Sequence, residues 1–236
     1  MSYFAIRHPA MNAPDSIALL RTQSLTGLVQ EALEQQIVAG DLKPGDPLRE
    51  GAIALSMGIS RGPVREAIRM LEARGLVDFA KNCGVQVRKL DGQQAAQIYQ
   101  VRIPLEGLIG ELVAQRTPAE SGQVLTPIME QMERLVKQQN VDAYAGLNLE
   151  FHDALARLTG NAALHETYRR LVIQLKLFRT HTFKHVPDTI LASLAEHTAI
   201  YQAVQNQDTH LASHLLRAHA EDSLRRLRIA LGTHAA

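Results

Sequence analysis

The chain has 236 residues, of which 46% are hydrophobic and 21% are charged, so it can bury a core and is neither a disordered nor a collagen-like chain. Lysine and arginine total 25 against 24 aspartate and glutamate, and the formal net charge of +1 means that any attraction to a polyanion must come from local clusters of charge. Cys83 is the single cysteine, which excludes an internal disulfide. The sequence shows no signal peptide and no apolar run of the ~20 residues that a bilayer requires, so we expect a cytoplasmic protein without a membrane partner.

Residues 1–23 carry scattered prolines and charges and are predicted to form a flexible arm. The next segment, residues 24–90, begins with three stretches whose apolar residues recur at steps of three and four, as on one face of a helix. It ends with two short runs that alternate between apolar and polar residues on either side of a glycine, which is typical of a β-hairpin. The helices are expected from Leu25 to Gly40, from about Glu50 to Met57 and from Ser60 to Gly75. This order of elements predicts a winged helix-turn-helix.

The third helix carries an arginine at every fourth position, Arg61, Arg65 and Arg69, on a face separate from its apolar stripe. An arginine can donate two hydrogen bonds to guanine in the major groove, and neighbouring basic groups can bind phosphates. A row of arginines by itself is more typical of a solvated helix face, but the preceding turn and the hairpin that follows are parts of a major-groove reader. We therefore predict a DNA interface from seven residues of this segment: Arg49, Ser60, Arg61, Arg65, Arg69, Asn82 and Gly84.

The same segment resembles the N-terminal domain of GntR-type bacterial transcriptional regulators. The resemblance runs through spaced positions: Leu42 to Gly45, Glu50, Ile53 and Ala54, Ser60 to Ile68, Leu71 and Glu72, and Gly75 to Val77. It implies a DNA-binding domain over residues 24–90. Gly62 departs from the threonine or lysine often found at its position and has no side chain for a phosphate contact.

Residues 93–232 show helical periodicity without strand alternation, which predicts an all-α helical bundle of about six or seven helices. The change of period places the junction between the two domains at residues 90–92. Two capping boxes, Thr117 to Glu120 and Ser193 to Glu196, predict helix starts, because a hydroxyl and a carboxylate can satisfy free amide groups of the first turn. A helix break is predicted at Thr126 and Pro127. The chain as a whole is therefore expected to be mainly α.

Three of the ten histidines, His152, His197 and His219, lie among apolar residues and are predicted to point into this bundle. Asn148 precedes His152 by about one helical turn and shares its face. For any single histidine the ordinary alternative is a ring that makes a hydrogen bond in the core or at the surface. Spacing alone therefore leaves the role of this cluster open.

This half of the chain resembles the helical effector domain, called the FCD domain, of the FadR branch of GntR-type regulators, in Val101 to Glu106, Asn148 to His152, Gly160 to Leu164, Glu196 to Ala203, Asp208 and His219. The resemblance implies that four residues hold a divalent metal ion: Asn148, His152, His197 and His219. The usual first ligand of the family is an aspartate, so Asn148 removes a negative charge. Either the metal affinity falls or an anionic effector becomes the fifth ligand, and we favour the second alternative. Imidazole ligands suit zinc or nickel.

Arg102 is the predicted effector contact, because its place on the first helix of this half resembles the ligand-facing arginine of the family. A guanidinium can bind a carboxylate or a phosphate with two hydrogen bonds. Arg102 also lies four residues before Glu106, which leaves an ion pair within one helix as the alternative.

Together these features predict a sequence-specific DNA-binding transcriptional regulator, a repressor, that binds a double-stranded DNA operator as a homodimer. A small effector bearing a carboxylate or a phosphate is expected to modulate this binding from the metal site. One alternative is a metal-dependent enzyme with an accessory DNA-binding domain, but its acid or base would have to be Glu150 or Glu196, and Glu196 is interpreted as a cap. Another is a non-specific architectural DNA-binding protein, which the near-zero net charge disfavours. We therefore expect that the chain is not an enzyme.

Overall fold

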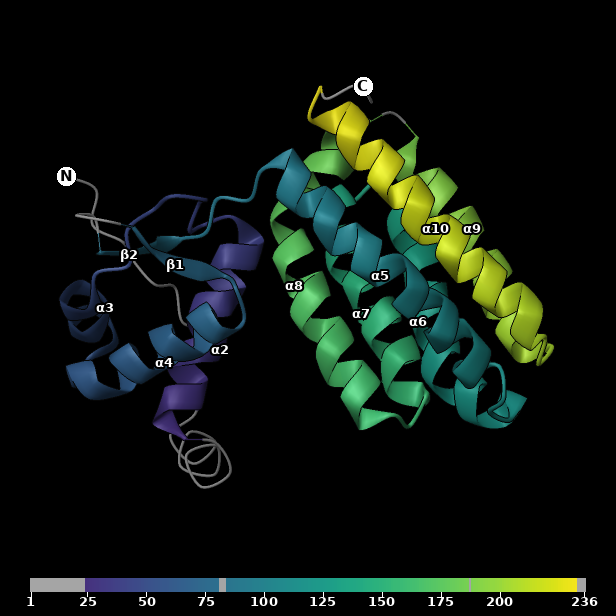
Figure 1. The fold of residues 1–236 in the computed structure, drawn as a ribbon, viewed down its shortest axis with the longest axis horizontal. Coiled ribbons are helices and arrows are strands. Elements are labelled where there is room, and N and C mark those ends of the chain that lie inside the picture. Colours follow the sequence, from purple (N-terminus) through teal and green to yellow (C-terminus); the bar gives the residue numbers. More distant parts are fainter. Residues whose placement is uncertain (1–23, 81–83, 187, 233–236) are drawn as a thin grey trace. The chain divides into compact units, whose positions relative to one another are not determined.

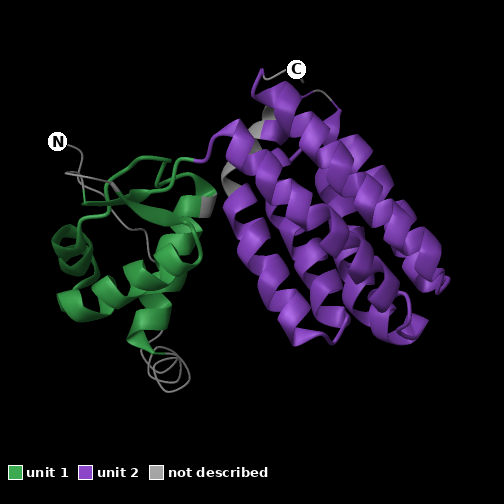
Figure 2. Cartoon of the chain, in the orientation of Figure 1, with its two compact units in different colours: residues 1–89 green, residues 90–236 purple. Residues whose placement is uncertain are grey.

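The computed structural model describes residues 24–80, 84–186 and 188–232, so the predicted arm, Asn82 and Cys83 lie outside the described residues. Packing contacts divide the chain into two compact units, residues 1–89 (unit 1) and residues 90–236 (unit 2), which Figure 2 shows in different colours. Unit 1 combines helices with one β-hairpin, and the described part of unit 2 is helical throughout (Figure 1). The prediction of a mainly α chain, with a winged helix-turn-helix followed by a helical bundle, is confirmed.

The described part of unit 1 has three helices followed by an antiparallel hairpin: α2 (Leu25–Ala39), α3 (Glu50–Met57), α4 (Arg61–Ala73), β1 (Val77–Ala80) and β2 (Gly84–Val87). In the hairpin Val77 lies opposite Val87. Helix α4 packs against α2 and buries Ile68 and Leu71, while its arginine face is exposed. The amphipathic pattern of α4 therefore fixes which face stays available for a partner.

The ends of the helices in unit 1 follow the local signals in the sequence. Gly40 and Gly75 have φ angles of 83° and 72°, a backbone conformation that L side chains rarely adopt, and they follow α2 and α4. The Ser24 hydroxyl accepts a hydrogen bond from the Gly27 amide and caps α2. Ser60 holds the N-cap position of α4 with extended backbone angles, but its hydroxyl makes no capping hydrogen bond. Ser60 therefore marks the start of α4, as predicted, by its position and backbone conformation and without a side-chain cap.

Unit 2 contains six helices among its described residues: α5 (Gly92–Val113), α6 (Pro118–Lys137), α7 (Val141–Leu158), α8 (Ala162–His185), α9 (Thr189–Gln205) and α10 (Thr209–Ala230). A capping box between Thr117 and Glu120 starts α6, as predicted, and a second one between Asp91 and Gln94 starts α5. The helices form a bundle in which α5 and α10 run side by side (Figure 1).

Two boundaries predicted from the sequence are wrong. Ser193 lies inside α9, which already begins at Thr189, so Ser193 and Glu196 form no capping box. Pro127 lies inside α6, which continues without a break to Lys137. Proline costs this helix one backbone hydrogen bond, but the burial of Leu125 and other apolar side chains on both sides of it favours the continuous helix. In both cases the packing of the helix against its neighbours, and not the local residues, determines where the helix begins or ends.

The core of unit 2 joins all six helices, with Phe151, Leu155 and Tyr144 of α7 at its centre. Helices α5 and α10 approach so closely at Gly110 that a methyl group built there would lie 2.6 Å from the carbonyl oxygen of Ala212. This packing holds α7, α9 and α10 with one face each toward the bundle interior. No helix in the described part of the chain is both long and apolar enough to cross a membrane.

Candidate metal centre and nucleic-acid interface

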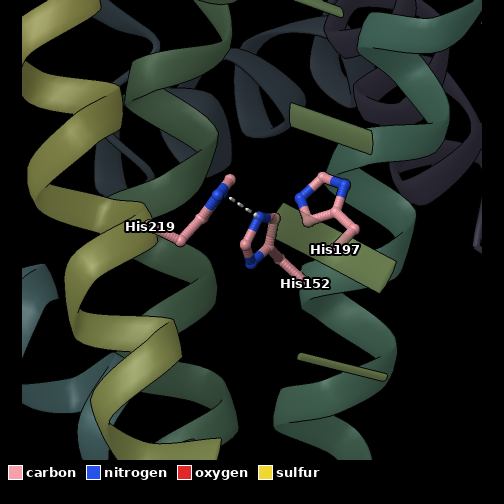
Figure 3. Close-up of side chains that lie close together, drawn as sticks. All are labelled: His152, His197 and His219. Atoms are coloured by element: carbon pink, nitrogen blue, oxygen red, sulfur yellow. Dashed lines mark hydrogen bonds between the residues drawn. The ribbon is translucent and has the colours of Figure 1, made fainter. Parts of the chain in front are cut away.

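Three imidazole rings from three helices meet inside unit 2. His152 comes from α7, His197 from α9 and His219 from α10, and Figure 3 shows the rings turned toward one another. Each ring is buried, and each offers one nitrogen such that these nitrogens all lie within 4.8 Å of one another. The Nε2 atoms of His152 and His219 are 3.1 Å apart, the contact drawn as a dashed line in Figure 3.

Asn148 adds an amide to this cluster from one turn before His152 on α7. Its Nδ2 atom lies 3.1 Å from Nε2 of His197, and its Oδ1 atom is buried without a hydrogen-bond partner. The structure therefore brings together all four residues that the sequence predicts as metal ligands. A buried carbonyl oxygen without a partner is costly in a protein interior, so its presence beside three imidazoles points to a missing positive partner.

Glu196 of α9 lies behind His219. Oε2 of Glu196 is 2.6 Å from Nδ1 of His219, and burial lowers the pKa of His219, so the neutral ring donates its Nδ1–H to the carboxylate. The Nε2 atom of His219 is then a bare acceptor that faces the cluster. Arg226 binds both oxygens of Glu196, at 2.7 and 2.8 Å.

Glu106 of α5 lies behind His152 at a longer distance and without a hydrogen bond to it. Its Oε1 atom is 3.4 Å from Nδ1 of His152, and burial lowers the pKa of His152 to about 3, so this ring is neutral as well. Burial alone would raise the pKa of Glu106, but the neighbouring His152 and Arg102 hold it well below its usual range. The ionised Oε1 atom also accepts a hydrogen bond of 2.6 Å from the Tyr168 hydroxyl.

Arg102 forms the ion pair with Glu106 that its spacing allows, with Nε and Nη2 at 2.9 and 2.6 Å from the same carboxylate oxygen. Both side chains are almost fully buried, so this pair differs from the solvated i, i+4 pair of an exposed helix. The Nη1 atom of Arg102 and the Oε2 atom of Glu106 have no hydrogen-bond partner. The guanidinium is therefore anchored by one edge and keeps an unused donor on another.

These residues fit a divalent metal ion. Because His219 donates its Nδ1–H to Glu196, its Nε2 lone pair faces Nε2 of His152 at 3.1 Å, a position that either an N–H of His152 or a cation can satisfy. Two nitrogens that each bind one ion at ~2.0–2.1 Å are separated by about 2.9–3.4 Å at octahedral or tetrahedral angles, which matches the observed distance. The donor set of three imidazoles and an amide oxygen is suited to a borderline-soft ion.

The described part of the chain contains five buried side-chain polar atoms without a hydrogen-bond partner: Arg102 Nη1, Glu106 Oε2, Asn148 Oδ1, His152 Nδ1 and Ser193 Oγ. Four of them belong to the residues described above, and Ser193 lies one turn before His197 on α9. Since more than ~90% of buried polar groups in proteins are hydrogen-bonded, this concentration makes the cluster the candidate site for a ligand. A small pocket lies next to it, lined by Tyr99, Leu175, Thr182, Phe183, Ser223, Arg226 and Leu227.

Most of the residues that lie behind the histidines were not predicted as part of the site. Glu106 was identified from its spacing only as a partner for Arg102, and Glu196 was interpreted as a helix cap. Tyr168 and Arg226 gave no local signal, because their contacts with Glu106 and Glu196 join residues 62 and 30 positions apart. Ser193 was predicted to cap the start of a helix that begins at Thr189 instead.

The residues predicted to contact DNA lie in unit 1, except that Asn82 is outside the described residues. The others are exposed: Arg49, Ser60, Arg61, Arg65, Arg69 and Gly84. Arg65 donates to Glu50 at 3.1 Å, and Arg69 donates to Glu66 at 2.9 Å. Because these ion pairs are exposed, they stabilise the fold little and leave the guanidinium groups available to another partner.

Two families match the sequence. Residues 25–87 match the bacterial regulatory proteins of the gntR family, and residues 97–222 match the FCD domain. The HTH-type transcriptional regulator YdhC of Bacillus subtilis (strain 168) is 31% identical over 79% of this chain and 84% of its own length. The HTH-type transcriptional repressor RspR of Escherichia coli (strain K12) is 25% identical over 88% of this chain and 92% of its own length.

A third relative, the gluconate operon transcriptional repressor of Bacillus subtilis (strain 168), is 25% identical over 85% of this chain and 84% of its own length. Among solved structures, Escherichia coli McbR/YncC has a TM-score of 0.77 at 21% identity, covering 88% of this chain and 98% of that chain. A GntR transcriptional regulator from Rhodococcus sp. RHA1 has a TM-score of 0.74 at 25% identity, covering 90% and 100%. The sequence relatives are transcriptional regulators rather than enzymes, as predicted for this chain.

Proposed function

Because the chain belongs to the GntR family of bacterial transcriptional regulators and carries a C-terminal FCD domain, we propose that it is an operator-specific repressor controlled by a small organic acid, which binds at a divalent metal ion in unit 2. The observation that carries the effector and metal part is the buried cluster of His152, His197 and His219, surrounded by polar atoms without partners. The enzyme alternative has no support, since the relatives are regulators.

His152, His197 and His219, each through one ring nitrogen, and Asn148, through its amide oxygen, would hold the ion, and zinc or nickel suits these ligands. When bound, it supplies a Lewis-acidic anchor for an oxygen of the effector. The side chains around it exclude bulk water, because all four ligands are buried.

The balance of charge around the cluster favours an anionic effector. The proposed ligands are themselves neutral, since an amide and a metal-bound imidazole carry no charge. The carboxylates behind it, Glu106 and Glu196, are each paired with an arginine, Arg102 and Arg226. Nearby residues therefore do not neutralise the positive charge of the ion. The Nη1 atom of Arg102, which has no hydrogen-bond partner, offers a contact for a carboxylate or a phosphate.

The exposed arginine face of α4 is proposed to read the operator. One short helix contacts only a few base pairs, so a homodimer that presents two copies of α4 to two half-sites reaches the usual affinity of specific repressors. The effector would act by binding one arrangement of the dimer more tightly than another and so changing the population that fits the operator.

Two variants test this assignment in opposite directions. His197→Ala removes a metal ligand, so we expect zinc binding and the response of operator binding to small carboxylic acids to be lost while basal operator binding persists. Arg65→Ala removes a base contact worth ~1–3 kcal/mol, so operator binding should weaken about 5- to 150-fold while zinc binding is kept. Gel shifts with excess random DNA and a zinc titration measure both.

The controls are His210→Ala and Arg170→Ala, which change exposed residues away from the two sites and should leave both readouts unchanged. An Arg65→Ala chain that binds its operator as well as the parent would refute the role of α4. Operator binding that random DNA competes away completely in the parent would favour a non-specific DNA-binding protein instead.

A further inference from the structure

We propose that Glu196 is a positioning residue for the metal site: it fixes His219 in the tautomer that leaves Nε2 free to bind the ion, and Arg226 fixes Glu196. This inference rests on the proposed metal site and adds two residues outside the predicted ligand set. It also gives Glu196 a role that replaces the capping role predicted from the sequence.

The geometry is that of a carboxylate behind a ligating imidazole. His219 is almost fully buried, and its Nδ1 atom is 2.6 Å from Oε2 of Glu196. A neutral imidazole carries its proton on either nitrogen, and the hydrogen bond that one nitrogen makes decides which one. Because a carboxylate only accepts, Glu196 places the proton on Nδ1 and turns the Nε2 lone pair toward His152.

Arg226 makes the position of Glu196 rigid. Its Nη1 and Nη2 atoms donate to the two different oxygens of Glu196, the two-pronged arrangement that fixes both distance and orientation. Arg226 follows His219 by two helical turns on α10, so the path from His219 to Glu196 and back to Arg226 ties α10 to α9.

Glu196 also lies directly before His197, another proposed ligand, on the same helix. One stretch of α9 therefore supplies a ligand and holds a second ligand that belongs to α10. The carboxylate behind His219 contributes more here than it would in a site with an aspartate ligand, because Asn148 leaves the set of proposed ligands without a negative charge. The hydrogen bond from Nδ1–H to a carboxylate makes Nε2 a stronger donor to the ion, and loss of such a partner typically weakens metal binding ~10- to 100-fold.

The experiment compares Glu196→Gln with the parent in the full chain. Zinc affinity is measured by competition with a chelator, and the tautomer of each histidine is read in the metal-free protein from long-range proton–nitrogen NMR correlations. We expect zinc affinity to fall ~10- to 100-fold and the His219 ring alone to lose its pure Nδ1–H form. Glu221→Gln, an exposed change on α10, is the matched control and should alter neither readout.

Arg226→Gln is the second variant and keeps the test decisive if Glu196→Gln does not fold. It should weaken zinc binding less than Glu196→Gln does, because the carboxylate remains but loses its anchor. Arg225→Gln, at the exposed neighbouring position, should leave the affinity unchanged. A Glu196→Gln chain that binds zinc within twofold of the parent, with the His219 tautomer unchanged, overturns the inference. A parent chain that binds no zinc overturns the proposed metal site itself.

Discussion

Asn148 lies where the family pattern that the sequence resembles usually has an aspartate. Its amide reaches His197 through Nδ2 and keeps Oδ1 without a partner, so the oxygen remains available to an ion. An amide oxygen is a weaker ligand than a carboxylate because it carries no charge. At the proposed metal site, an amide in this position would therefore lower the affinity for the ion and leave the charge of the ion free to attract an anion.

Asn148→Asp tests this trade. We expect zinc affinity to rise at least about tenfold, because a charged ligand now faces the ion. The affinity for an anionic effector should fall, since the carboxylate neutralises part of the charge. Without metal, the variant should unfold at a lower temperature than the parent, because it buries a carboxylate beside His197 without a cation.

The control for this variant is Asn140→Asp at the N-cap of the same helix, where both residues cap equally well. It should change neither zinc affinity nor stability. Chelator competition and thermal unfolding, each with and without zinc, measure the three chains. A zinc affinity that is unchanged or lower in Asn148→Asp would contradict the assignment of Asn148 as a ligand.

The four proposed ligands could be predicted from the sequence, because their apolar neighbours and their resemblance to a known pattern are local features. The shell behind them could not. Glu196 carries a sequence signal that fits a helix cap equally well, and only the packing of α9 against α10 shows that it contacts His219 and Arg226. A hydrogen-bond partner far away in the sequence leaves no periodic trace.

At the scale of elements, short-range signals predicted the helices of unit 1 and the start of α6 well. The glycines after α2 and α4 and the capping box of α6 act within one turn, so the sequence contains their whole cause. Pro127 shows the limit of such reasoning. Its effect on α6 depends on how much apolar surface the helix buries on either side, and that surface belongs to other helices.

Gly110 tests the packing that brings α10, and with it His219, into place. Gly110→Ala would put a methyl group 2.6 Å from the backbone of Ala212, so α5 and α10 must separate. We expect a loss of stability of about 1–3 kcal/mol and weaker zinc binding, measured by urea unfolding and chelator competition. The matched control is Gly146→Ala in α7, where the new methyl group meets open space and should stabilise the helix by ~0.5–1 kcal/mol.

Equal stability of the Gly110→Ala chain and the parent would mean that α5 and α10 can move apart freely. In that case the close approach of these helices would not be what holds His219 toward His152.

At the scale of the whole molecule, the chain joins two different units. Unit 1 has an exposed arginine face, and the interior of unit 2 contains buried polar atoms without hydrogen-bond partners. The order of the two parts was predictable, because the change from strand alternation to helical periodicity is a property of the sequence. The polar atoms without partners were not predictable, since they emerge only when six helices have packed. Because these atoms lie inside unit 2, they support the proposal that this unit binds an effector, in addition to the proposed DNA binding by unit 1.

The most direct test is X-ray diffraction at the zinc absorption edge from crystals of the full chain dialysed against zinc. The account predicts one strong anomalous peak between the rings of His152, His197 and His219, within ~2.0–2.2 Å of their ligand nitrogens and of Oδ1 of Asn148. Zinc bound only at surface histidines, with the three buried rings hydrogen-bonded to one another, would contradict it.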